Sequence, residues 1–385
     1  MKLGLIGIDE VGLSFGLLCE KNGHTVLVSN NRDDYVYNLN QKICITNEPL
    51  IQSMLFDSKN FSATTNNSEV IKNSDIIFIF VPTPSNIDGN YDTTKVFDVV
   101  SEFYSLSSQN IPLYNKKVVI CSTTNPGEVE QIQQRLNMFN IQVAYNPFFT
   151  NTGEIVKDIE NHETILIGGE YQELINELVQ LQIDLKKVIV NVYSMSSKAA
   201  ELTKISINSF LSAKITYANM LGEVITKSGI EDEVNMVLSA IGGDSGIGKK
   251  HMKYGFGFGG PSMNGDTKAL KHFVDTVGVN SDLISSINES NKNHIVFLKE
   301  HYIKKNPSKE IPFIMSQITY KKGTDVLEES QQFQLCVELL NDGYSVNVIE
   351  TTEVANKLNS MSESYDGRLK FYQQGSNPEG ILINL

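Results

Sequence analysis

The chain has 385 residues and a formal net charge of −13. This length exceeds what one small hydrophobic core accommodates and predicts two or three domains. The acidic balance argues against nucleic acid and anionic membranes as general partners, because binding to phosphate groups requires a basic surface.

Cysteine usage and hydropathy indicate a protein of the reducing cytoplasm. The four cysteines, Cys19, Cys44, Cys121 and Cys336, are scattered and form no CxxC pair, which predicts neither a disulfide framework nor a zinc site. No apolar run approaches the roughly 18 residues of a membrane span. The opening "MKLGLIGI" is typical of a buried strand and lacks a signal-peptide pattern.

The first 190 or so residues alternate between short apolar runs and polar helical stretches. Continuous runs rich in Val and Ile, separated by crossovers, predict a parallel sheet that is covered on both faces. The expected strands are 2–8, 25–30, 74–84, 116–123, 141–147 and 163–169. This is the pattern of a Rossmann-type doubly wound α/β domain, whose ligand crevice lies at the carboxyl ends of the strands.

The middle of the chain predicts one long helix over 196–229, which would bridge domains or form a dimer interface. A helix of about 30 residues spans roughly 45 Å. More helix is expected to about residue 300. The pattern of 311–320, 328–343 and 344–351 then predicts a βαβ unit in a smaller C-terminal α/β domain, with loops and one last strand at the end. The expected domains are 1–195, 196–300 and 301–385.

The turn after the first expected strand, "GIDEVG", has the place of a dinucleotide-binding fingerprint, G-x-G-x-x-G. Gly7 and Gly12 supply the first and third glycines, but Asp9 replaces the second. The middle glycine allows a pyrophosphate to approach the backbone, and a carboxylate there opposes the anion by charge and by bulk. The second expected strand ends in Asn30 with Arg32 behind it, where NAD-binding proteins carry an acid. The domain has therefore either lost its cofactor or rearranged the site for NAD or NADP.

A glycine-rich segment, "GFGFGGPSMNGD" at 255–266, predicts a loop whose backbone comes very close to something. One interpretation is that Gly255, Gly257, Gly259 and Gly260 adopt positive φ in a turn. The other is that the loop lies against a bound molecule. No side chain in the segment is an obvious nucleophile, and His251 upstream is expected on the surface.

Seven collinear segments resemble the UDP-glucose/GDP-mannose dehydrogenases over nearly the whole chain. They are 23–40, "VPTPSNIDGNYDTTKV" (81–96), "CSTTNPGEVE" (121–130), "YNPFFTNTGEIVKDI" (145–159), the helical 199–224, the glycine-rich segment and "ITYKKGTDVLEES" (318–330). The resemblance implies a cofactor contact at Thr83, substrate contacts at Gly257, Gly259, Gly260 and Lys321, and two successive NAD-dependent oxidations of a sugar C6 alcohol. The aldehyde would be trapped by a loop cysteine, because a thiol adds readily and leaves well.

The sequence departs from the family pattern at the residues of the second oxidation. Position 262 should be the cysteine and is Ser262, a far weaker nucleophile without an adjacent base. The glutamate that assists thioester hydrolysis falls at Phe148 in the substrate-binding segment. Further losses fall at Thr152, Gly246, Gly265 and Glu328. The residues that the resemblance assigns to the first oxidation remain: Thr123, Lys204, Asn208 and Asp266. They also fit a buried polar network without a catalytic role.

Three hypotheses follow from these residues. The first is a family member without dehydrogenase activity that acts as a nucleotide-sugar binder, a regulatory subunit or a structural partner. The second is an oxidoreductase that is NADP-linked or stops at the aldehyde. The third is a full dehydrogenase with Ser262 as nucleophile. The resemblance also implies UDP-sugar or related ligands, a homodimer through the 196–229 helix, and a place in surface-polysaccharide synthesis.

Overall fold

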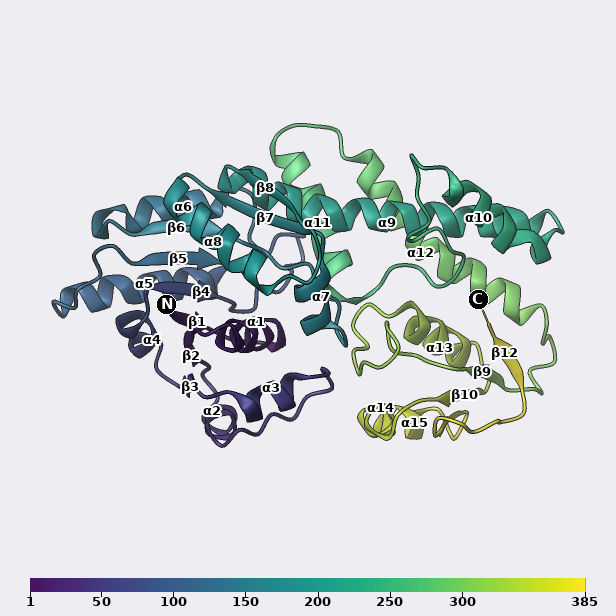
Figure 1. The fold of residues 1–385 in the computed structure, drawn as a ribbon. Coiled ribbons are helices and arrows are strands. Elements are labelled where there is room, and N and C mark those ends of the chain that lie inside the picture. The colour runs from purple at the N-terminus through teal and green to yellow at the C-terminus, as the bar shows by residue number, and fades with distance from the viewer. Residues whose placement is uncertain (385) are drawn as a thin grey trace. The chain divides into compact units, whose positions relative to one another are not determined.

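The computed structural model describes residues 1–384 and divides into two compact units, 1–205 and 206–385 (Figure 1). The division falls within the long helix α9 (Ser197–Lys227), which the sequence predicted almost to the residue. The Rossmann-type sheet, the long helix and the smaller C-terminal α/β part of the fold prediction are all present.

The first unit contains an eight-stranded sheet with the order β3-β2-β1-β4-β5-β6-β7-β8. Its strands are β1 (Lys2–Ile6), β2 (Thr25–Ser29), β3 (Phe61–Thr64), β4 (Ile76–Ile79), β5 (Lys117–Ile120), β6 (Gln142–Tyr145), β7 (Thr164–Gly169) and β8 (Asn191–Met195). All pairs are parallel except β6 and β7, which run antiparallel. The six strands expected from the sequence are confirmed. The edge strands β3 and β8 were missed, because neither has a continuous apolar run.

Helices cover both faces of this sheet, as expected for apolar runs in which successive side chains point to opposite faces. Leu5 and Phe78 belong to one core and Ile6 and Ile79 to the other. Helices α1 (Glu10–Lys21), α3 (Ile51–Asp57), α7 (Ile155–Asn161) and α8 (Gln172–Leu185) contribute to the first core. Helices α4 (Asn67–Asn73), α5 (Thr94–Ser108) and α6 (Glu128–Leu136) contribute to the second. Helix α2 (Asp33–Asn40) and a short 3₁₀ segment, 137–139, complete the unit.

The second unit combines the rest of α9 with further helices and a four-stranded parallel sheet of order β11-β10-β9-β12. The strands are β9 (Phe313–Met315), β10 (Val346–Ile349), β11 (Leu369–Tyr372) and β12 (Ile381–Ile383). The helices are α10 (Val234–Gly243), α11 (Gly260–Thr276), α12 (Asp282–Ile303), α13 (Gln331–Asn341), α14 (Thr352–Lys357) and α15 (Asn359–Ser364), with a 3₁₀ segment at 231–233. The prediction of loops and a single strand at the C-terminus is wrong, because two strands, β11 and β12, form there.

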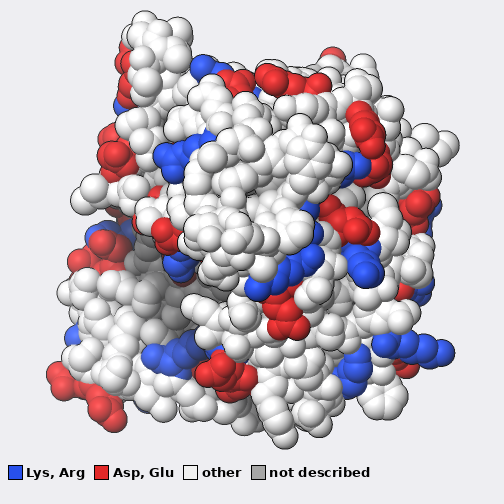
Figure 2. All heavy atoms as spheres, turned by 90° about the vertical axis from the view of Figure 1, so that its left-hand side faces the viewer, with Lys and Arg blue, Asp and Glu red and all other residues white. Residues whose placement is uncertain are grey.

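The cysteines, the hydropathy of the helices and the surface charges bear on the sequence-based expectations. All four cysteines are buried and unpaired. No helix within residues 1–384 is both long and apolar enough to cross a membrane. On the face drawn in Figure 2, the described Lys and Arg side chains are interspersed with Asp and Glu rather than gathered into one basic patch.

Candidate functional site

The turn between β1 and α1 retains two of the three glycine positions of a dinucleotide site. Gly7 has φ +74°, and a Cβ built there would lie 2.3 Å from Cγ1 of Val81. At Gly12 a Cβ would lie 2.9 Å from the ring of Phe80. Only glycine fits such spaces without movement of the neighbouring atoms. The tight turn and the close packing of helix on sheet are therefore preserved.

Asp9 occupies the N-terminus of α1 with its own carboxylate. It is the N-cap residue, and Oδ1 accepts a hydrogen bond of 2.8 Å from Gly12 N. The residue is exposed at the surface, but crowding around its carboxyl group raises the pKa, while the bond from Gly12 N opposes the rise. A helix N-terminus attracts anions because its N–H groups are unpaired and its dipole is positive. In this protein the anion is already supplied by the chain.

At the end of β2, the side chain of Asn30 is engaged within the turn. Its Nδ2 donates to Ile8 O at 3.0 Å, and its Oδ1 accepts from Arg32 N at 3.0 Å. The guanidinium of Arg32 is exposed and forms an ion pair of 2.9 Å with Asp34. Thr83 is half-buried beyond β4. Asn30 and Arg32, which were expected to select the dinucleotide, thus both have partners within the chain.

Phe148 belongs to an aromatic cluster beside the sheet. Its ring centroid lies 5.0 Å from that of Phe15 and 5.7 Å from that of Phe80. The side chain packs against the larger core of the first unit. The segment that follows is held by buried Glu48, whose carboxylate accepts from Gly153 N and, at 3.1 Å, from Ile155 N. An apolar cluster therefore stands at the position where the resemblance expected a carboxylate.

Glu201, which the sequence reasoning did not single out, organises the turn after β5. Its side chain is fully buried and accepts from Thr124 Oγ1 at 2.7 Å, Gly127 N at 2.6 Å and Val129 N at 3.0 Å. Burial raises its pKa to about 7, although these donors favour the ionised form. The partners lie more than 70 residues away in the chain, so no local pattern reveals them.

The pKa of Glu201 predicts a pH-dependent stability. The folded pKa of about 7 lies above the ordinary value of 4.5, so the folded state retains the proton over a range in which the unfolded state releases it. Relative to Glu201→Gln, the free energy of unfolding should therefore fall by up to about 3 kcal/mol as the pH rises from about 4.5 to 7. Urea titrations across this range measure it. Parallel pH profiles of the two proteins would contradict the assignment.

The remaining expected residues of the first unit are Thr123 and Lys204. Lys204 is buried, with Nζ 5.9 Å from the ring centroid of Tyr91. Tyr91 N in turn donates to Asn125 Oδ1 at 2.9 Å, in the turn that Glu201 holds. Thr123 lies half-buried in the same turn. The turn is thus ordered by side chains from α9, and the roles of Thr123 and Lys204 stay a prediction.

In the second unit the structure brings Asn208 and Asp266 together. Asn208 Nδ2 donates to Asp266 Oδ2 at 2.6 Å, and Asp266 is fully buried. One turn further along α9, Ser212 Oγ lies 3.3 Å from Oγ1 of Thr267, the residue that follows Asp266. These pairs form a polar seam between α9 and α11. A buried carboxylate of this kind is costly to leave unpaired, so the seam explains the retention of both residues without requiring catalysis.

The glycine-rich segment is a loop up to Gly259, after which α11 begins. Only Gly260 of its four early glycines has positive φ, at +76°. The expectation of positive φ is therefore wrong for Gly255, Gly257 and Gly259. A Cβ at Gly257 would lie 2.1 Å from Asn291 Oδ1, and one at Gly259 would lie 2.6 Å from the carbonyl oxygen of Glu329. The close approach inferred from the sequence is thus an approach to other parts of the protein.

Ser262 is exposed in the first turn of α11. No hydrogen bond of its Oγ is observed within the described residues of the second unit. His251 is exposed, as expected. Lys321 lies in the loop before α13, where its carbonyl accepts from Thr319 Oγ1 at 3.1 Å and Thr324 Oγ1 at 2.7 Å. No cluster of His, Cys, Asp and Glu in the described part of the chain has the arrangement of a metal site.

A cavity of about 520 Å³ in the first unit does not coincide with the expected crevice. Its walls include Lys21 at the end of α1, Asn60 just before β3 and Lys187 before β8. These positions lie at the amino ends of the strands, whereas ligands of open α/β sheets bind at the carboxyl ends.

Comparison with known proteins identifies two family domains in this chain. Residues 1–186 match the NAD-binding domain of the UDP-glucose/GDP-mannose dehydrogenase family, and residues 198–293 match its central domain. The chain belongs to this family. It is 29% identical over 365 residues to UDP-glucose 6-dehydrogenase of Rickettsia typhi, covering 92% of this chain and 82% of that protein. It is 23% identical over 379 residues to GDP-mannose 6-dehydrogenase of Pseudomonas aeruginosa, covering 95% and 84%.

The fold agrees with the solved structures of the UDP-glucose/GDP-mannose dehydrogenase family. A UDP-glucose dehydrogenase from Pyrobaculum islandicum superposes with a TM-score of 0.85 at 23% identity, covering 96% of this chain and 85% of that one. Within this family, the β1–α1 turn of the present chain fits a dinucleotide only in part. Gly7 and Gly12 form the cradle, but the Asp9 carboxylate bonded to Gly12 N stands where a pyrophosphate requires free N–H groups.

Proposed function

We propose that this chain is a nucleotide-sugar-binding member of its family that has lost the two-step oxidation and acts as a regulatory or structural homologue. The observation that carries the proposal is the Asp9 carboxylate at the N-terminus of α1. It opposes the pyrophosphate of any nicotinamide dinucleotide by charge and by volume. Without a hydride acceptor, neither oxidation step proceeds.

Two further positions support the loss independently of the cofactor. Ser262 is exposed, and a serine hydroxyl is a far weaker nucleophile than the thiol that the family resemblance expects there. Phe148 is packed between Phe15 and Phe80, so no carboxylate is present at that position to assist hydrolysis. Nucleophile and hydrolytic carboxylate belong to the same half-reaction, and their joint absence fits the loss of that chemistry.

The second candidate is an oxidoreductase that uses NAD or NADP and releases the aldehyde. The Asn208–Asp266 pair at 2.6 Å and the buried Lys204 favour it, since these are the groups that the family resemblance assigns to the first oxidation. Arg32 would then leave Asp34 and pair with a 2′-phosphate. Asp9 argues against this candidate for either dinucleotide.

Calorimetric titration separates the two functions. We expect UDP-glucose or UDP-N-acetylglucosamine to bind, while NAD⁺, NADH, NADP⁺ and NADPH give no heat up to millimolar concentration, the level that corresponds to about −4 kcal/mol. Binding of one dinucleotide at micromolar concentration would instead favour the oxidoreductase, and product analysis would then look for an aldehyde. If neither class of ligand binds, the proposed function is wrong.

We also infer a homodimer formed through α9. Four large apolar side chains, Phe210, Tyr217, Met220 and Val224, are between 44% and 69% exposed. Their spacing places them in one stripe along the helix, and an exposed apolar stripe of this kind is typical of an interface with another protein. Light scattering should give twice the monomer mass, and a monomer for a Phe210→Asp variant.

A further inference from the structure

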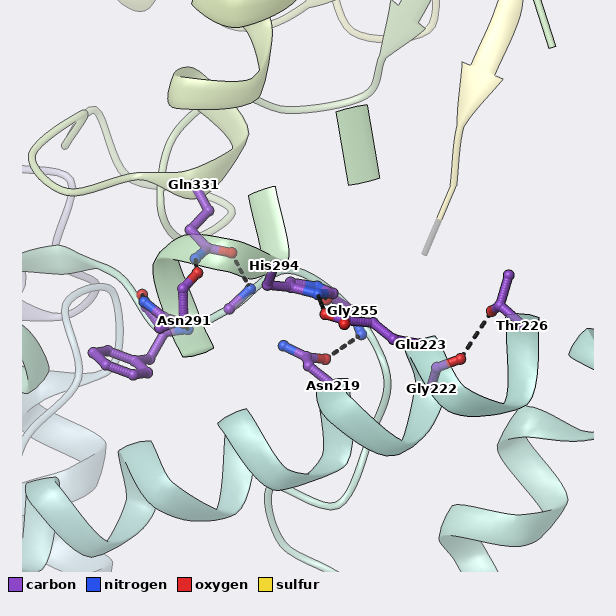
Figure 3. A network of polar contacts seen from close by, with 10 residues as sticks. Asn219, Gly222, Glu223, Thr226, Gly255, Asn291, His294 and Gln331 are labelled. Carbon is purple, nitrogen blue, oxygen red and sulfur yellow. Dashed lines mark hydrogen bonds and ion pairs between the residues drawn. The ribbon is translucent and has the colours of Figure 1, made fainter. Parts of the chain in front are cut away.

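The first residues of the glycine-rich loop, 255–258, are held by side chains rather than by regular backbone pairing. Gly255 N donates to Asn219 Oδ1 of α9 at 3.0 Å, and Gly255 O lies 2.8 Å from Nε2 of His294 on α12 (Figure 3). The N–H group and the carbonyl group of Gly255 are therefore both fixed by side chains from distant parts of the sequence. Because a glycine-rich backbone is conformationally free, these contacts determine where the loop lies.

The next residues of the loop are held in the same way. Gly257 N donates to Gln331 Oε1 at 2.5 Å. Asn291 accepts from Phe258 N and donates to Phe258 O, each at 3.0 Å. Gln331 Nε2 closes the set by donating to the carbonyl of Asn291 at 2.5 Å. The absence of a Cβ at Gly257 makes room for the two amide groups. We call Asn219, Asn291, His294 and Gln331 the loop clamp.

His294 differs from the amide side chains of the clamp, because its two hydrogen bonds depend on how many protons the imidazole ring and its partner carry. Nε2 faces the carbonyl of Gly255, which can only accept, so Nε2 must carry hydrogen. Nδ1 lies 2.7 Å from Oε1 of Glu223, also an acceptor when ionised. One proton must therefore lie between Nδ1 and Oε1, either as imidazolium with carboxylate or as imidazole with carboxylic acid. Without this proton, a lone pair on Nδ1 would face a lone pair on Oε1 of Glu223.

The surroundings of His294 leave Glu223 as its charged partner. The ring is 1% exposed and makes an edge contact with Tyr254 at 5.8 Å, while Phe297 stacks beside it at 6.4 Å. Two basic side chains from α9 and α12, Lys227 and His301, lie against Phe297. Glu223, with its side chain 27% exposed, borders a polar cavity of about 230 Å³ between α9 and α12. The cavity gives protons a route to the pair.

We propose that His294 and Glu223 are positioning residues of the glycine-rich loop. The single proton between them keeps the loop in the position that the loop clamp defines. The consequence for ligands rests on the proposed function, since the loop is the surface on which a nucleotide sugar would lie. After loss of the proton the neutral ring keeps one N–H, and the carboxylate of Glu223 favours its placement on Nδ1. Nε2 then turns a lone pair toward Gly255 O, so the bond to Gly255 is lost and the clamp loosens. A rise in pH then frees the loop without any change in the rest of the fold.

Amide hydrogen exchange of residues 255–258, expressed as protection relative to the intrinsic rate at each pH, tests the proposal. In the unmodified protein the protection should fall about tenfold as the pH rises and the pair loses its proton, a factor that corresponds to the loss of one charge-assisted hydrogen bond. His294→Phe, which retains an aromatic ring but not its hydrogen bonds, should lack the protection at every pH. His301→Phe on the same helix is the matched control and should behave like the unmodified protein.

Glu223→Gln provides the decisive comparison. Its amide can donate to Nδ1 of a neutral imidazole, so Nε2 still donates to Gly255 without an additional proton. The loop should remain protected, and the pH dependence should disappear. The same pH dependence in Glu223→Gln and the unmodified protein would overturn the proposal, as would unchanged protection in His294→Phe. If His294→Phe does not fold, the pH profiles of Glu223→Gln and the unmodified protein still test the proposal.

A separate titration with UDP-glucose keeps the two hypotheses distinguishable. If the proposed function holds, the ligand should bind about tenfold more weakly to His294→Phe than to His301→Phe. If no variant binds UDP-glucose, the proposed function fails, while the exchange of residues 255–258 still tests the positioning role by itself.

Discussion

Replacing Asp9 with glycine should give this protein measurable affinity for a nicotinamide dinucleotide, at least about tenfold tighter than that of the unmodified chain, or about 1.4 kcal/mol. The substitution removes the carboxylate that now bonds to Gly12 N and completes the fingerprint with Gly7 and Gly12. The helix N-terminus then presents its N–H groups to the pyrophosphate. Calorimetry with NAD⁺ and NADP⁺ measures the gain and shows which dinucleotide is preferred.

Asp9→Asn separates the two ways in which Asp9 opposes the cofactor. Asparagine caps a helix about as well as aspartate, so the local structure is retained, and glycine costs only a few tenths of a kcal/mol as a cap. The asparagine removes the charge and leaves the bulk. We expect affinity to increase from the unmodified protein to Asp9→Asn and again to Asp9→Gly. If Asp9→Gly binds no better than the unmodified protein, Asp9 is not the reason for a missing cofactor.

Phe148→Glu should lower the free energy of unfolding by about 2–4 kcal/mol. The change removes a half-buried ring from contact with Phe15 and Phe80 and places a carboxylate in an apolar cluster. Truncation of a large core aromatic residue costs about 3–5 kcal/mol, and an unpaired polar group there adds to the loss. Urea unfolding followed by circular dichroism measures the effect.

Phe148→Leu is the matched control, because it retains an apolar side chain and should cost less than about 1.5 kcal/mol. A Phe148→Glu variant as stable as Phe148→Leu would show that the site still accepts the family's glutamate. Ser262→Cys combined with Phe148→Glu would then be a reasonable attempt to restore the oxidation. A large loss of stability in Phe148→Glu would mean that the aromatic packing no longer accommodates the glutamate.

The central strands and the long helix were predictable because their signals are local. The runs at 76–79 and 118–120 are buried on both faces and therefore continuously apolar, and α9 has the length and spacing of a helix throughout. Edge strands β3 and β8 pair on one side only and carry polar residues, so their sequences resemble loops. The C-terminal strands are short and depend on pairing with distant segments.

By itself, the sequence determined the family, the Rossmann-type order of elements and the residues at which the chain departs from its relatives. These properties depend on motif order and on periodicity along the chain. Only the tertiary structure decided what the departing residues do: that Asp9 caps its own helix, and that Phe148 belongs to an aromatic cluster. It also revealed Glu201, which holds a turn more than 70 residues away, and His294, which holds a loop 39 residues away. Such contacts join segments that only folding brings together, so no local pattern contains them.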